Sequence, residues 1–135
     1  MPSESEIRDI LTSVKTIAVV GWSPKPDRPS HGVAAFLKRR GYRVIPVNPG
    51  QAGQRALGET VVATLAEAGP VDMVDIFRRS EEAGAVADDA VRLGAKVVWM
   101  QLGVVDESAA ARARAAGVRV VMNRCPAIEI PRLGL

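Results

Sequence analysis

Hydrophobic and polar residues follow one another along this chain in blocks that favour buried strands separated by amphipathic helices. Continuous apolar runs of strand length occupy residues 16–21, 42–49, 71–77, 95–103 and 118–123. Between them, apolar positions recur at helical spacing in residues 4–14, 30–40, 80 onward and 106–116. Residues 50–58 are predicted as a loop, and residues 59–69 as a short strand followed by one or two helical turns. This alternation predicts an α/β fold, a Rossmann-like doubly wound parallel sheet of five or six strands with helices on both faces.

Polar residues mark the starts of the predicted helices. Ser3 and Glu6 have the spacing of a capping box, and Ser30 and Asp106 stand where two further helices begin. The run Ser80–Glu82 opens another helix, with acidic side chains at the positive end of its dipole. One sequence pattern occurs three times, at Gly41, Gly94 and Gly117: a glycine, one further residue, a basic residue and then an apolar strand. It is typical of the passage from helix to strand in repeating β–α units.

Length and composition narrow the class of protein. A chain of 135 residues has room for one core, so we expect one domain over residues 1–135, with the helix of residues 1–15 packed on it. A net charge of +3 and an aromatic content of 4% argue against nucleic acid as a partner. One cysteine excludes an internal disulfide framework and a cysteine-based metal site. We expect a cytoplasmic protein, since no apolar stretch approaches a membrane span and the N-terminus is unlike a signal peptide.

Basic residues gather in the loops that follow the predicted strands. In an open parallel sheet, ligands bind beyond the carboxyl ends of the strands, which selects residues 21–30, 48–53, 77–80, 101–105 and 123–126. These loops or their neighbours carry Lys25, Arg28, Arg78, Arg79 and Arg124. A basic rim beside a helix start at Ser30 suits an anionic, phosphate-bearing ligand. The alternative is that surface basic residues gather there by chance.

The motifs of several other kinds of ligand-binding and catalytic site are absent from the sequence. Gly21 is followed by Trp22 and Ser23, so the glycine fingerprint of a nicotinamide dinucleotide site is missing, and the second strand ends in Asn48-Pro49 without an acidic residue. NADP stays open only through Arg28. No hydrolase, P-loop or zinc-protease motif occurs, and we predict neither a catalytic set nor a metal site.

Three titratable residues remain without an assigned role. His31 stands where a helix begins, so it could contact ligand or accept a phosphoryl group, although a solvent-facing role is the more usual one. Asp72 and Asp75 are carboxylates within a predicted strand, and no chemistry is assigned to them.

Three sequence blocks resemble a known family. Residues 18–49 (AVVGWSPKPDRPSHGVAAFLKRRGYRVIPVNP), 71–82 (VDMVDIFRRSEE) and 96–126 (KVVWMQLGVVDESAAARARAAGVRVVMNRCP) are similar to the small bacterial and archaeal CoA-binding proteins. These look like the N-terminal CoA-binding domain of the succinyl-CoA synthetase alpha subunit standing alone. The resemblance runs from about Ile7 to Pro126. The second synthetase domain, with its phosphorylated histidine, has no counterpart in this sequence, so the resemblance does not imply ligase activity.

The resemblance implies a set of coenzyme A contacts, which divides according to the part of the ligand that each residue would meet. Around the nucleotide phosphates it places Gly21, Ser23, Lys25, Arg28, Pro29 and Ser30. At the nucleotide end it places Val47, Asn48 and Pro49. Along the adenosine and diphosphate it places Phe77, Arg78, Arg79 and Ser80, and along the pantetheine arm Gln101, Leu102 and Gly103. Trp22 is included in the set although it stands where the family has a small residue.

Cys125 has two interpretations. It follows the last strand, where Arg124 could lower its thiol pKa and favour a mixed disulfide with the thiol of coenzyme A. The alternative is a small packing residue.

Together these observations predict a protein that binds coenzyme A or an acyl-CoA without transforming it. Two alternatives are an NADP-dependent oxidoreductase and the CoA-binding half of a split acyl-CoA ligase. A third is a redox or regulatory protein that binds a partner through Cys125 and exposed apolar residues near Trp99. The predicted partner is a small molecule rather than nucleic acid or membrane, and a homo-oligomer or protein partner stays open.

Overall fold

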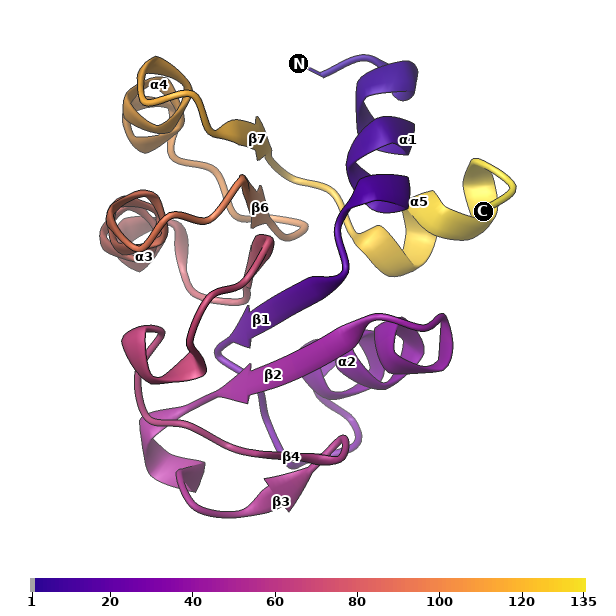
Figure 1. Ribbon diagram of the computed structural model, residues 1–135, viewed down its shortest axis with the longest axis vertical. Helices are drawn as coiled ribbons and strands as arrows, with labels where there is room; N and C mark the ends of the chain where they lie inside the picture. Colours follow the sequence, from indigo (N-terminus) through magenta and orange to yellow (C-terminus); the bar gives the residue numbers. More distant parts are fainter. Residues whose placement is uncertain (1) are drawn as a thin grey trace.

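Five strands pair in one parallel sheet with the order β2-β1-β5-β6-β7, as the computed structural model of residues 2–135 shows (Figure 1). The sheet strands are β1 (Thr16–Val20), β2 (Arg43–Val47), β5 (Met73–Ile76), β6 (Val97–Met100) and β7 (Arg119–Val121). The helices are α1 (Glu4–Ser13), α2 (Pro29–Arg39), α3 (Ser80–Arg92), α4 (Glu107–Ala115) and α5 (Pro126–Arg132). The predicted Rossmann-like α/β fold with a parallel sheet is therefore confirmed.

The helices cover both faces of the sheet. Helices α1, α2 and α5 pack on one face, where Ile17, Val19 and Trp99 point into the core. Helices α3 and α4 pack on the other face, against Ala18, Val74 and Val98 (Figure 1). Neighbouring residues of a strand thus enter different cores, as strand geometry requires. Both cores being apolar explains why these strands appear in the sequence as continuous hydrophobic runs.

The segment between β2 and β5 agrees with the prediction in residues 59–69, where the expected short strand and helical turn are present, and differs in residues 50–58, which were expected to form a loop. It forms a small antiparallel hairpin of β3 (Arg55–Ala56) and β4 (Glu59–Thr60), flanked by the 3₁₀ turns η1 (Pro49–Gln51) and η2 (Ala66–Ala68). The two turn residues, Leu57 and Gly58, both have positive φ, 58° and 74°. This is the backbone of a tight hairpin turn, for which Asn-Gly is the usual sequence signal. Since Leu-Gly lacks that signal, the pattern predicted a loop.

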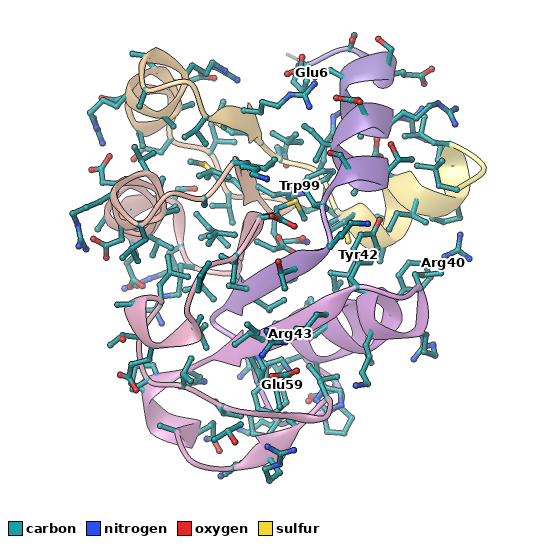
Figure 2. The ribbon with its side chains drawn as sticks, viewed as in Figure 1. Glu6, Arg40, Tyr42, Arg43, Glu59 and Trp99 are labelled. Atoms are coloured by element: carbon teal, nitrogen blue, oxygen red, sulfur yellow. The ribbon has the colours of Figure 1, made fainter. Side chains whose placement is uncertain are left out.

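The hairpin is fastened to the outer strand of the main sheet. Arg43 of β2 donates to both carboxylate oxygens of Glu59, from Nε at 3.1 Å and from Nη2 at 3.0 Å (Figure 2). Val47 and Val62 add a single parallel bridge. The hairpin therefore covers part of the edge that β2 would otherwise leave unpaired.

Two helix starts also differ from the prediction. Helix α2 begins at Pro29 with Arg28 as its cap residue, so Ser30 is a buried residue of the first turn and not the cap. The fixed φ of proline suits the first helical position. Helix α5 was not predicted, since it is short, lacks a polar capping bond and contains Pro131. Helices α1 and α4 do begin as predicted, with Ser3 and Asp106 accepting from the backbone N–H groups of Glu6 and Ala109.

Trp99 lies at the centre of the molecule (Figure 2). Its side chain is fully buried, and its Nε1 donates to the carbonyl oxygen of Arg124 at 2.8 Å. Trp99 itself therefore belongs to no exposed surface, and the exposed apolar residues near it in sequence are Leu102 and Val105. Among the helices formed by residues 2–135, none has the length and apolar character needed to cross a membrane.

Candidate ligand-binding site

The loops after β1, β5, β6 and β7 meet the start of α2 around a cavity of about 560 Å³, which we call the α2-side cavity. Its size is within the range of small-molecule sites. Most of the predicted site residues line it: Gly21, Ser23, Lys25, Arg28, Pro29, Ser30, Phe77, Arg78, Arg79, Gln101, Leu102 and Cys125. Val33 and Val104 complete the lining and were not predicted, because core and cavity-lining valines share the same sequence pattern.

A second cavity of about 560 Å³, the α3-side cavity, opens on the other side of the β1 loop. Val47 and Pro49 line it, together with unpredicted residues from the segment before η2 and from α3: Ala63, Thr64, Leu65, Glu81, Glu82, Ala85, Val86 and Asp89. Gly21 and Arg78 line both cavities. The two cavities therefore meet at the β1 and β5 loops.

Gly21 lies at the junction in a conformation that favours glycine. Its φ is +91°, and a Cβ built there would lie 2.4 Å from the carbonyl oxygen of Phe77 and 3.2 Å from Cδ of Arg78. Its N–H donates to the carbonyl oxygen of Val47 at 3.0 Å. The missing side chain thus allows the β1 and β5 loops to touch.

Trp22, Asn48 and His31 support the first loop and do not line either cavity. The Trp22 ring is buried and stacks on the His31 ring, with 5.9 Å between centroids. Asn48 donates from Nδ2 to the carbonyl oxygen of Trp22 at 2.7 Å, and His31 Nδ1 lies 3.0 Å from the carbonyl oxygen of Ser23. The large side chain at position 22 therefore has a structural role in the loop, which the sequence did not indicate.

Ser80 and Gly103, also predicted as contacts, join two loops instead. Ser80 Oγ donates to the carbonyl oxygen of Gly103 at 3.2 Å and accepts from the N–H of Val105 at 3.0 Å. Asn123 accepts from the N–H of Gly103 at 2.8 Å. These bonds fix the β6 loop against the start of α3 and the end of β7.

The five basic residues of the predicted rim have different environments. Lys25 and Arg28 are exposed and have no carboxylate partner among residues 2–135. Arg78 and Arg79 both pair with Glu82. Arg124 lines neither cavity, and its Nη1 lies 3.8 Å from the buried carboxylate of Glu129 in α5. The guanidinium expected to act on the Cys125 thiol is thus already paired with a carboxylate.

The part of the α2-side cavity beside the ends of β6 and β7 has no charged lining residue. Because the sheet order runs from β1 through β5 to β6 and β7, the basic loops lie toward one side and Gln101, Leu102 and Cys125 toward the other. Gln101 is buried with its side-chain amide against Asp75, and the amide orientation that satisfies both groups has Nε2 donating to the two carboxylate oxygens, at 2.8 and 3.1 Å. Cys125 is also buried, at 6% exposure. Within residues 2–135, no three His, Cys, Asp or Glu side chains gather as a metal site.

Asp75 lies in β5 with no exposed surface, and this burial raises its pKa well above the ordinary value. The stability that Asp75 contributes is fully present below the ordinary carboxyl pKa and is lost as pH rises toward the folded-state pKa. Asp75→Asn keeps an acceptor for Gln101 and does not ionise. We therefore expect the free energy of unfolding of this variant to exceed that of the wild type by an amount that grows with pH. Urea unfolding from about pH 4 to pH 9 measures the difference.

Asp72→Asn is the matched control at the start of the same strand. Asp72 accepts from the N–H groups of Lys15 and Thr16, at 2.8 and 3.2 Å, and these bonds lower its pKa. Its contribution to stability is lost as pH falls, so the control has the opposite pH dependence. Parallel stability curves for wild type and Asp75→Asn would contradict the expectation.

Known proteins resemble this chain over most of its length. Residues 15–131 match a family described as CoA binding domain. The chain is 44% identical over 125 residues to the uncharacterized protein YneT of Bacillus subtilis (strain 168), covering 92% of this chain and 91% of that one. A solved Thermus thermophilus structure superposes with a TM-score of 0.92 at 37% identity, covering 98% of this chain and 99% of that one. The dinucleotide-forming acetyl-coenzyme A synthetase 1 of Ca. Korarchaeum cryptofilum shares the fold, with a TM-score of 0.68 and 24% identity over 81% of this chain and 26% of its own.

Proposed function

Because this chain belongs to the CoA binding domain family, we propose that it binds coenzyme A or an acyl-CoA along the two adjoining cavities, without transforming it. The observation that carries the proposal is the division of the α2-side cavity into a part lined by basic residues and a part without charged lining residues. Coenzyme A has the same division, since its nucleotide end carries three phosphates and its pantetheine arm carries none.

The basic part supports phosphate binding. Lys25 and Arg28 are exposed, and the first turn of α2, which follows directly, contains no acidic residue. Guanidinium groups and the positive end of a helix dipole both favour phosphate. Lys25 and Arg28 are therefore the proposed contacts of the phosphates, together with the first turn of α2.

The remaining lining supports the two uncharged parts of the ligand. The α3-side cavity has apolar walls at Val47, Leu65 and Val86, which suit an adenine ring, and its α3 wall also carries the carboxylates of Glu81, Glu82 and Asp89. At the other end, Gln101, Leu102 and Cys125 are the proposed contacts of the pantetheine arm. The predicted residues that line neither cavity are proposed to hold these loops in place rather than to touch the ligand.

Calorimetric titration with coenzyme A, 3′-dephospho-coenzyme A and NADP tests the proposal. We expect coenzyme A to bind most tightly, because each charge-assisted phosphate contact is worth about 1.5–3 kcal/mol and dephospho-coenzyme A lacks one phosphate. Equal, negligible heats for the three ligands would refute coenzyme A binding, and tighter binding of NADP would favour the oxidoreductase.

Arg28→Ala is expected to weaken coenzyme A binding about 10- to 100-fold, through loss of one such contact. Arg39→Ala is the matched control, since Arg39 is exposed in the last turn of the same helix, far from the cavity, and carries the same charge. If both variants weaken binding equally, net charge rather than a contact at Arg28 accounts for the effect.

A second candidate is the CoA-binding half of a two-component acyl-CoA ligase. The fold shared with the acetyl-coenzyme A synthetase, of which this chain covers 26%, favours it. Its test is ATP-dependent formation of acyl-CoA after mixing with an ATP-grasp subunit from the same organism. Product that requires both proteins would support this candidate over binding alone.

A further inference from the structure

Glu82 holds the two arginines of the β5 loop at once. Its Oε2 accepts from Nε of Arg78 at 2.8 Å, and its Oε1 accepts from Nη2 of Arg79 at 2.7 Å and from Nε of Arg79 at 3.2 Å. Each carboxylate oxygen therefore serves one guanidinium. Arg78 lies in the loop before α3 and Arg79 is the cap residue of this helix, while Glu82 lies in its first turn, four and three residues further along the chain.

This ion-paired group lies on the path of any ligand that occupies both cavities. Arg78 and Arg79 line the α2-side cavity, whereas Arg78 and Glu82 line the α3-side cavity. Hydrogen bonds from Arg79 and Arg78 lower the pKa of Glu82, so its carboxylate is charged at neutral pH. An anion that approaches Arg78 or Arg79 thus meets two guanidinium groups whose charge is partly neutralised by one carboxylate.

We propose that Glu82 is an internal competitor for ligand phosphate: an anion that occupies the Arg78–Arg79 pair until a ligand phosphate displaces it. The proposal rests on coenzyme A binding and deepens it, because it names the charge that the ligand must supply. A diphosphate carries more charge than one carboxylate and accepts from both guanidinium groups, so it competes successfully. A pantetheine arm without phosphates cannot displace Glu82.

The exchange explains how an exposed ion pair can weaken phosphate binding while contributing little to stability. Exposed pairs of this kind are weak, and Glu82 and Arg78 keep 31% and 44% of their side-chain surface exposed. Breaking the pairs therefore lowers phosphate affinity modestly, by about 3- to 10-fold in total. Lys25 and Arg28 have no carboxylate partner among residues 2–135, so they attract phosphate without first breaking an ion pair.

Glu82→Gln tests the proposal, because it removes the charge and keeps the shape of the side chain. Titrations at constant ionic strength use inorganic pyrophosphate, coenzyme A and pantetheine as probes. We expect the variant to bind pyrophosphate and coenzyme A about 3- to 10-fold more tightly than the wild type and to leave pantetheine unchanged. Glu81→Gln is the matched control, since Glu81 is 69% exposed and reaches Arg79 only at 3.7 Å.

An additional variant separates displacement from a change in net charge. In an Arg78→Ala, Arg79→Ala background, Glu82→Gln should no longer tighten pyrophosphate binding. Equal effects of Glu82→Gln and Glu81→Gln, or no effect of Glu82→Gln on pyrophosphate, would overturn the proposal. Failure of the wild type to bind coenzyme A, with the pyrophosphate effect intact, would instead overturn the proposed function and leave the displacement at Glu82 standing.

Discussion

Gly21→Ala is expected to lower the free energy of unfolding by about 3–5 kcal/mol and to abolish binding along both cavities. The φ of +91° already disfavours a side chain, and the new Cβ would lie 2.4 Å from the Phe77 carbonyl oxygen. A backbone atom cannot move aside by a rotamer change, so the β1 and β5 loops must separate. Because Gly21 and Arg78 line both cavities, this separation alters the place where the cavities meet.

Urea unfolding and calorimetry measure the two effects. Gly32→Ala is the matched control, since Gly32 lies within α2 and a Cβ built there would meet nothing within 4 Å. In a helix, alanine is favoured over glycine by about 0.5–1 kcal/mol, so this control should be neutral or stabilising. A Gly21→Ala protein with wild-type stability and affinity would show that the two loops need no close approach.

Trp99→Ala is expected to destabilise the protein by about 3–5 kcal/mol, the usual range when a buried tryptophan is truncated. The ring has no exposed surface, and its Nε1 donates to the carbonyl oxygen of Arg124, next to Cys125 in the cavity wall. Trp99→Phe keeps much of the ring volume and removes this bond. It should cost about 1–3 kcal/mol, because a carbonyl oxygen loses its donor.

Trp22→Phe provides the comparison for the hydrogen bond. Trp22 is 4% exposed, and its Nε1 has no hydrogen-bond partner within residues 2–135. Its replacement therefore removes volume without breaking a hydrogen bond, and it should cost less than Trp99→Phe in urea unfolding. Equal costs for the two Phe variants would mean that the bond to Arg124 contributes nothing measurable.

The sequence predicted the sheet because its strands are buried on both faces. Ile17, Ala18 and Val19 enter two different cores, and this requirement produces an apolar run that needs no tertiary information to recognise. The turn of the hairpin at Leu57 and Gly58 could not be predicted in this way, since both residues have positive φ and Leu-Gly is not a favourable sequence for such a turn.

In the candidate site, the positions of the residues along the chain predicted which loops lie together. They did not predict which basic side chains are paired with a carboxylate. Arg28 and Arg124 are equivalent in the sequence, as basic residues beside a strand end, yet one is exposed and the other faces Glu129 of an unpredicted helix. Glu82 was expected only as an acidic residue at a helix start. Its pairing with two arginines depends on the path of the backbone before α3, because Arg78 and Arg79 precede the helix and the helical spacing rule does not apply to them.

The placement of α1 beside α5 has a consequence for how the protein forms during synthesis. Ile7 and Ile10 near one end of the chain share a core with Ile130 and Leu133 near the other, and an ion pair joins Glu4 to Arg132 across 128 residues of sequence. On the ribosome, this face of the sheet stays incomplete until residues 126–133 emerge. The α3 and α4 face is complete somewhat earlier, because the last residues of its core are Val118, Val120 and Met122. We therefore expect a nascent chain to close its two cores at different times, with the α1 side closing last.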